Sequence, residues 1–113
     1  MIPTTVLIFV CTQPQDMRRS FDGLALAIRQ LLGQDPRSGD MFVFANRRGR
    51  QLRVLWWDDG GFSLLCRRLH QALFQLPKPD DPSDRSVVID RNGLAALIRG
   101  VPTSGRRSAS TSA

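Results

Sequence analysis

The amino-terminal third of the chain contains one continuous apolar run followed by one amphipathic segment. Residues 4–11 are β-branched or apolar throughout, which predicts a strand that is buried on both faces and lies inside a sheet. Residues 17–32 carry apolar side chains three and four positions apart, which predicts a long helix with one apolar face. Asp16 is placed to cap this helix, and Gly33 is placed to end it.

The middle third predicts a β-meander over residues 41–68. Three apolar runs are separated by two turn sequences, Asn-Arg-Arg-Gly-Arg at 46–50 and Asp-Asp-Gly-Gly at 58–61. Asparagine, aspartate and glycine favour tight hairpin connections because they tolerate the backbone angles that such turns require. We therefore expect three consecutive antiparallel strands.

Centring the two turns assigns the side chains of the meander to two faces. With the first turn centred on Arg48, Phe44 faces Leu52 and Phe42 faces Val54. With the second turn centred between residues 59 and 60, alternation predicts one apolar face that packs on the helices, made of Phe42, Phe44, Leu52, Val54, Trp56 and Leu65. The opposite face is mixed and contains Gln51, Arg53, Leu55, Trp57, Phe62, Leu64, Cys66 and Arg68.

The carboxy-terminal third predicts one more strand at 86–89 and a helix at about 91–99, with Asp90 or Asn92 as its cap. The predicted fold is α+β: a mainly antiparallel sheet with the central meander 41–68, a long helix at about 17–32 and this shorter carboxy-terminal helix. We expect residues 1–102 to form a single domain. The Ser-, Thr- and Arg-rich tail 103–113 is expected to be disordered.

Charge and composition narrow the class of partner. The 113 residues include 16 basic and 10 acidic side chains, which gives a formal charge of +6. Every basic residue except Lys78 is arginine, whose guanidinium group bonds phosphate through two parallel contacts. This balance indicates nucleic acid as the partner, although the codon usage of a GC-rich genome would also enrich arginine.

The two cysteines, Cys11 and Cys66, are too few for a disulfide framework and lack the spacing of metal ligands. We expect both to be free thiols in a reducing cytoplasm. No segment has the length of a membrane span or the features of a secretory signal. The predicted location is therefore cytoplasmic, without membrane contact.

The same arrangement of strands places six arginines towards one end of the sheet: Arg47, Arg48, Arg50, Arg53, Arg67 and Arg68. Like charges repel each other, so such a cluster favours an anionic partner, and arginines at a hairpin tip are suited to phosphate contacts. Arg18 and Arg19, expected in the first turn of the first helix, are second candidates. Trp57 and Phe62 offer stacking surfaces to unpaired bases. The alternatives are a solvated hairpin tip and aromatic side chains that are covered by the carboxy-terminal half.

Catalytic patterns are weak in this sequence. His70 is the single histidine and has no cysteine or acid at ligand spacing, and no glycine-rich phosphate-binding loop occurs. The absence of tyrosine excludes a tyrosine recombinase, and the absence of glutamate excludes the usual Asp-Asp-Glu transposase triad. We expect no enzyme activity, no catalytic residue, no bound metal and no cofactor.

A series of motifs in fixed order resembles the TnpB-type accessory proteins of the IS66 family of insertion sequences. The resemblance extends from about Pro3 to Val101 and rests on residues 16–24, 35–39, 42–44, 46–48, 55–62 and 67–69. It implies a protein that is encoded beside a separate transposase and assists transposition. The chain departs from the family pattern at Cys66, His70 and Ala72, which makes the strand pairing after Arg68 harder to predict.

The function predicted from these features is accessory DNA binding in transposition, with element ends and the transposase of the same element as partners. Two other functions compete with it. One is an adaptor that contacts the transposase and not DNA. The other is a metal-dependent nuclease subunit in which Asp58 and Asp59 hold Mg²⁺. The sequence does not determine the oligomeric state.

Overall fold

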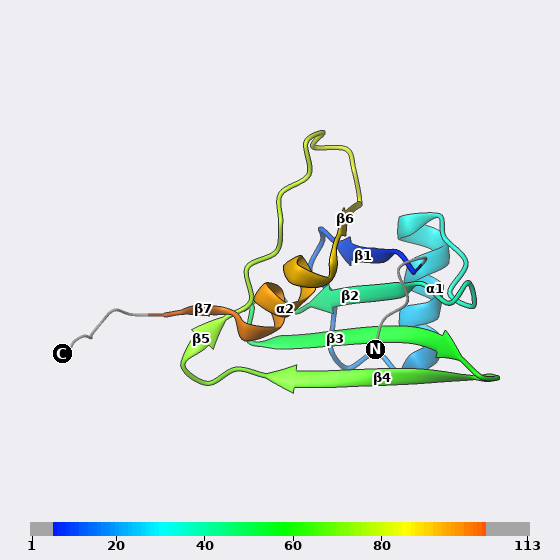
Figure 1. The fold of residues 1–113 in the computed structure, drawn as a ribbon, viewed down its shortest axis with the longest axis horizontal. Helices are drawn as coiled ribbons and strands as arrows, with labels where there is room; N and C mark the ends of the chain where they lie inside the picture. The colour runs from blue at the N-terminus through cyan, green and yellow to red at the C-terminus, as the bar shows by residue number, and fades with distance from the viewer. Residues whose placement is uncertain (1–5, 104–113) are drawn as a thin grey trace.

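The computed structural model describes residues 6–103 and is built around a five-stranded sheet (Figure 1). The strand order is β4-β3-β2-β1-β6, and the bounds are β1 (Ile8–Cys11), β2 (Met41–Ala45), β3 (Gln51–Asp58), β4 (Gly61–Arg68) and β6 (Ser86–Ile89). The remaining elements are α1 (Phe21–Leu32), α2 (Arg91–Arg99) and a small two-stranded sheet of β5 (Ala72–Leu73) and β7 (Val101–Pro102).

Strand β1 lies inside the sheet, as its apolar run predicts. All four of its residues are buried. It pairs in parallel with β2, where Ile8 lies opposite Met41, and in antiparallel with β6, where Ile8 lies opposite Ile89. Two parallel neighbours need a crossover connection, and α1 lies within the segment that connects β1 to β2.

The predicted fold class was wrong because of its long helix. The sheet itself is mixed: β1 and β2 run in parallel, whereas the other three strand pairings are antiparallel. The long helix at 17–32 does not form; α1 has twelve residues and begins at Phe21. Residues 16–19 instead form a turn, in which the backbone N–H of Arg18 donates to Asp16 Oδ1 over 2.9 Å and that of Arg19 donates to the Asp16 carbonyl. Aspartate side chains that bond the nearby backbone in this way compete with helix formation.

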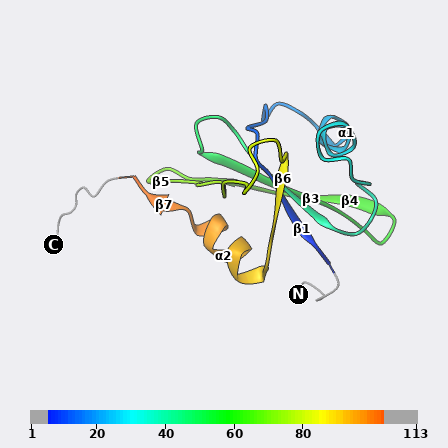
Figure 2. The same cartoon turned by 90° about the horizontal axis from the view of Figure 1, so that it is seen from above.

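The sheet is the middle layer of the molecule, with α1 on one side and α2 on the other (Figure 2). The core on the α1 side consists of Phe9, Cys11, Met17, Leu24, Ala27, Ile28, Phe42, Phe44 and Leu55. The core on the α2 side consists of Ile8, Val10, Val43, Ala45, Leu52, Val54, Leu69, Phe74, Leu94 and Leu97. Because both faces of the sheet are covered, its central strands are apolar at nearly every position.

The predicted register of the first hairpin was wrong by one residue, whereas the second hairpin matches. Phe44 pairs with Arg53, not with Leu52, so Phe42 and Phe44 lie on the α1 side while Leu52 and Val54 lie on the α2 side. Side chains alternate between faces, so a shift of one residue exchanges them. In the second hairpin Trp57 lies opposite Phe62, as predicted.

The side chain of Asn46 sets the register of the first hairpin. Its Oδ1 accepts hydrogen bonds of 3.0 Å from the backbone N–H groups of Arg50 and Gln51. The backbone N–H of Asn46 donates to the Gln51 carbonyl, and Gly49 adopts φ +72°. The loop is therefore centred between Arg48 and Gly49, half a residue beyond the predicted centre.

Strand β6 and helix α2 lie at the residues predicted for them. Asp90 caps α2 by accepting a hydrogen bond of 2.7 Å from the backbone N–H of Gly93. The strands β5 and β7 were not predicted, because two residues are too few to show a periodic pattern. Of the predicted tail, residues 104–113 lie outside the described part of the chain. Neither α1 nor α2 is long and apolar enough to cross a membrane.

Candidate nucleic-acid interface

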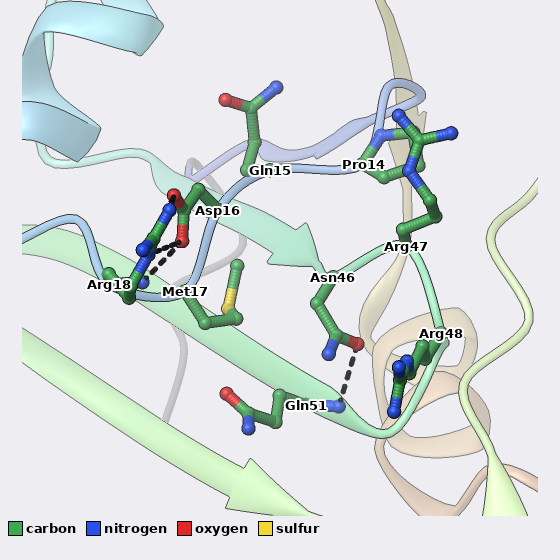
Figure 3. A pocket seen from close by; sticks show the side chains of 9 residues that line it. All are labelled: Pro14, Gln15, Asp16, Met17, Arg18, Asn46, Arg47, Arg48 and Gln51. Atoms are coloured by element: carbon green, nitrogen blue, oxygen red, sulfur yellow. Dashed lines mark hydrogen bonds and ion pairs between the residues drawn. The ribbon is translucent and has the colours of Figure 1, made fainter.

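A pocket of about 850 Å³ lies between the segment that leads into α1 and the loop that joins β2 to β3 (Figure 3). Pro14, Gln15, Asp16, Met17 and Arg18 line one side, and Asn46, Arg47, Arg48 and Gln51 line the other. The amide side chains of the lining offer hydrogen-bond donors and acceptors beside the arginines.

Contacts with β2 hold the segment that leads into α1 in place. The backbone N–H of Gln15 donates to the carbonyl of Ala45, the last residue of β2, over 2.9 Å. Met17 is buried in the core on the α1 side. Gln15 and Met17 are thus held against the sheet. The fold therefore sets the distance between the Arg18 backbone and the 46–50 loop.

The arginines of the pocket differ in whether an acid neutralises them. Arg18 forms an ion pair of 2.8 Å with Asp16. The other ion pair within residues 6–103 is a longer one, 4.0 Å, between Arg29 and Asp35. Arg47 and Arg48 are exposed and pair with no acid in this part of the chain. The loop therefore presents two positive charges that its surroundings leave uncompensated.

The ion pair with Arg18 should be visible in the titration of Asp16. Hydrogen bonds from the Arg18 side chain and backbone lower the pKa of the Asp16 carboxyl to about 2. The folded-state pKa thus lies below the unfolded value of about 3.9. Any stabilisation from the pair is present above pH 4 and is lost as the pH falls towards 2. A ¹³C NMR titration of the carboxyl group is expected to show a midpoint near 2.

A pair of substitutions checks the cause of this depressed pKa. Arg18→Gln should move the Asp16 midpoint up towards the unfolded value, because it removes the charged donor. Arg29→Gln removes an arginine of the other ion pair and should leave the midpoint unchanged. An Asp16 midpoint near 3.9 in the unsubstituted protein would contradict the ion pair.

The remaining predicted arginines do not converge on one surface. Arg53 lies on the α1 side, where its Nη1 donates to the Arg19 carbonyl over 2.9 Å. Arg67 lies opposite Leu52 on the α2 side, and its Nε donates to the Ile98 carbonyl at the end of α2 over 2.8 Å. Arg50 Nη1 donates to the His70 carbonyl. These three side chains bind the backbone of neighbouring segments, so each contributes to holding the fold together.

Arg18, Arg19 and Arg68 are the other three predicted arginines. Arg18 and Arg19 precede α1 and do not form its first turn, contrary to the prediction. Arg68 lies opposite Gln51 on the edge strand β4 and is exposed. The structure therefore brings together Arg18, Arg47 and Arg48 of the eight predicted residues. Sequence reasoning missed the polar lining: Asp16 was predicted only as a helix cap and Asn46 only as the first residue of a turn.

Comparison with known proteins identifies the family. Residues 6–108 match the family described as IS66 Orf2 like protein. The chain belongs to this family. It is accordingly an accessory protein associated with the transposition of insertion sequences, which confirms the resemblance seen in the sequence.

Two relatives of this chain come from Sinorhizobium fredii (strain NBRC 101917 / NGR234). Uncharacterized protein y4hO is 32% identical over 103 residues, which cover 89% of this chain and 87% of the relative. Uncharacterized protein y4jC is 39% identical over 74 residues, which cover 66% of this chain and 63% of the relative. No solved structure matches this chain.

The aromatic pair predicted to stack on bases lies near the turn between β3 and β4. Trp57 and Phe62 contact each other edge to face, with ring centroids 4.9 Å apart. The guanidinium of Arg37 lies 4.8 Å from the centroid of the Trp57 ring. Both aromatic side chains are half-buried. The tryptophan thus already has an intramolecular cationic partner.

The other groups considered for chemistry do not line the pocket. Asp58 and Asp59 lie at the turn between β3 and β4, and no group of three His, Cys, Asp or Glu side chains within residues 6–103 is arranged to hold a metal ion. Cys11 and Cys66 are free, as predicted. Burial raises the pKa of the Cys11 thiol, which makes its thiolate scarce at neutral pH.

Proposed function

We propose that this protein binds DNA as a non-catalytic accessory factor of insertion-sequence transposition, at element ends or together with the transposase. Arg47 and Arg48 are the principal phosphate contacts in this proposal. The observation that carries it is the position of these two adjacent arginines: both are exposed on one loop, both line the pocket, and no acid of residues 6–103 neutralises them.

The backbone of the loop favours this role. Asn46 closes the loop through two hydrogen bonds to the backbone N–H groups of Arg50 and Gln51. The side chains of Arg47 and Arg48 therefore extend from a backbone that is already ordered, which lowers the entropy lost on binding. A guanidinium group meets a phosphate through two parallel hydrogen bonds, so two neighbouring arginines suit successive phosphates of a strand.

The other arginines have supporting roles. Arg18 lies across the pocket from Arg47 and Arg48. It is paired with Asp16 on its own side of the pocket and is available to a phosphate that displaces the carboxylate. Arg50 and Arg53 keep their charges while bonding backbone carbonyls. They raise the positive potential around the pocket without direct contact, which speeds the approach of a polyanion.

A salt titration tests the proposal. Binding of the full chain to a 20-base-pair duplex and to a single strand of the same length is measured between 50 and 300 mM salt. Substituting both Arg47→Gln and Arg48→Gln should reduce the slope of log K against log salt by about 0.9 per lost duplex contact, hence by nearly two in all. The affinity of this double variant for DNA at low salt should also fall.

The matched control removes the same charge elsewhere. Arg91→Gln with Arg99→Gln removes two exposed arginines of α2, on the other side of the sheet. This variant should keep most of the salt dependence and most of the DNA affinity of the unsubstituted protein. Equal effects of the two double variants would show that binding depends on net charge alone and not on the position of Arg47 and Arg48. Salt-independent binding, or no binding to either form of DNA, would contradict the proposal and favour the transposase adaptor.

A further inference from the structure

Strand β4 is a free edge of the sheet. It ends the strand order, and within residues 6–103 its sheet partner is β3 alone. It has eight residues, and the last four, Leu65 to Arg68, are exposed. Figure 1 shows β4 along the border of the sheet with no other element beyond it. A strand edge of this length is a template for pairing with another strand.

The turn before β4 determines which of its backbone groups are unpaired. Asp59 and Gly60 have φ values of +51° and +82°, as in the two-residue turns that join a close hydrogen-bonded pair, here Asp58 and Gly61. Hydrogen-bonded and non-hydrogen-bonded pairs alternate along an antiparallel ladder. The backbone groups that point away from β3 therefore belong to Phe62, Leu64, Cys66 and Arg68.

The two ends of this edge carry opposite charges. Arg67 and Arg68 lie at its end, and Asp58 and Asp59 lie at the turn before its start. A second β4 strand in antiparallel orientation brings the arginines of each copy beside the aspartates of the other. A parallel strand would instead bring like charges together, which is unfavourable.

We propose that two copies of this chain associate through their β4 strands in antiparallel orientation, related by a two-fold axis. The axis requires one residue to lie opposite its own copy, and Leu64 or Leu65 is at the middle of the strand. The Leu65 side chain, 41% exposed in the single chain, is then covered by the partner. The occupant is a second copy, because the charges at the two ends of β4 complement each other.

The opposite edge of the sheet does not offer the same surface. Strand β6 has four residues and is followed by the cap and first turn of α2. It therefore provides half the length for pairing. The proposal is independent of DNA binding, since Arg47 and Arg48 lie on the loop between β2 and β3 and not on β4.

Sedimentation equilibrium of the full chain under reducing conditions tests the proposal. We expect a concentration-dependent dimer. Cys66→Pro removes an N–H that points away from β3, so it should block pairing at the edge while leaving the β3–β4 ladder intact, and the variant should be monomeric. Cys66→Ser keeps the N–H and should remain dimeric. Circular dichroism confirms that both variants are folded.

A charge exchange tests the same interface without altering the backbone. Arg68→Asp should weaken the dimer about tenfold or more, because it places like charges beside each other. Adding Asp58→Arg to this variant should restore most of the association. Arg99→Asp makes the same change of charge on α2 and should have little effect. A monomer at all concentrations overturns the proposal, as does a dimer that Arg68→Asp and Cys66→Pro leave unchanged.

Discussion

Replacing Phe44 by alanine is expected to lower the free energy of unfolding by about 3 to 5 kcal/mol. The Phe44 side chain is 0% exposed and packs in the core between the sheet and α1, together with Phe42, Leu55 and Ile28. Truncation removes the transfer energy of a whole aromatic ring and leaves a cavity that rigid neighbouring strands fill incompletely. Such a loss is a large part of the roughly 5 to 15 kcal/mol that stabilise a domain.

Phe21 provides a matched control for this substitution. It is the first residue of α1 and is 42% exposed. Phe21→Ala should therefore change the free energy of unfolding by less than about 1 kcal/mol. Urea denaturation, followed by circular dichroism, measures both variants. Equal losses for Phe21 and Phe44 would show that Phe44 is not inside the core.

Replacing Gly100 by alanine is expected to cost about 2 to 5 kcal/mol, the sum of backbone strain and overpacking. Gly100 ends α2 with φ +74° and ψ −177°, a conformation that is open almost only to glycine. A Cβ atom there would lie 2.5 Å from Leu69 Cδ1 and 2.9 Å from the Leu73 carbonyl oxygen. Relief would require moving the backbone of β5, which is paired with β7.

Gly33 separates the two contributions at Gly100. It ends α1 with φ +64° and ψ +28°, and a Cβ atom there would meet no other atom within 4 Å. Gly33→Ala should cost about 1 to 2 kcal/mol for the left-handed conformation alone. The measurement is again urea denaturation. A smaller loss for Gly100→Ala than for Gly33→Ala would contradict the close approach of α2 to Leu69 and Leu73.

The strands of the five-stranded sheet and the carboxy-terminal helix could be predicted because short-range patterns specify them. The apolar run of β1 and the cap of α2 at Asp90 are local features. The start of α1 was not predictable in this way. Asp16 is suited equally to capping a helix and to forming a turn. The turn forms because the Arg18 side chain also donates to the Asp16 carboxylate, and because the Gln15 backbone is bonded to the end of β2.

The candidate site was predictable where it depends on one loop. Arg47 and Arg48 follow directly from the turn sequence, and the structure places both on the pocket. The positions of Arg53 and Arg67 depend on carbonyl acceptors far away in the chain, at Arg19 and Ile98. The one-residue error in register also changed which side of the sheet nearby residues occupy. Tertiary contacts of this kind leave no periodic signal in the sequence.

The pairing of β1 with β6 has a consequence for how the protein is made. Ile8 lies in register with Ile89, so one edge of the first strand stays open until residue 89 has left the ribosome. During that interval an apolar strand is exposed to other nascent chains, and such edges promote aggregation. Overproduction in a host at reduced temperature, which weakens apolar association, should therefore increase the yield of properly folded protein.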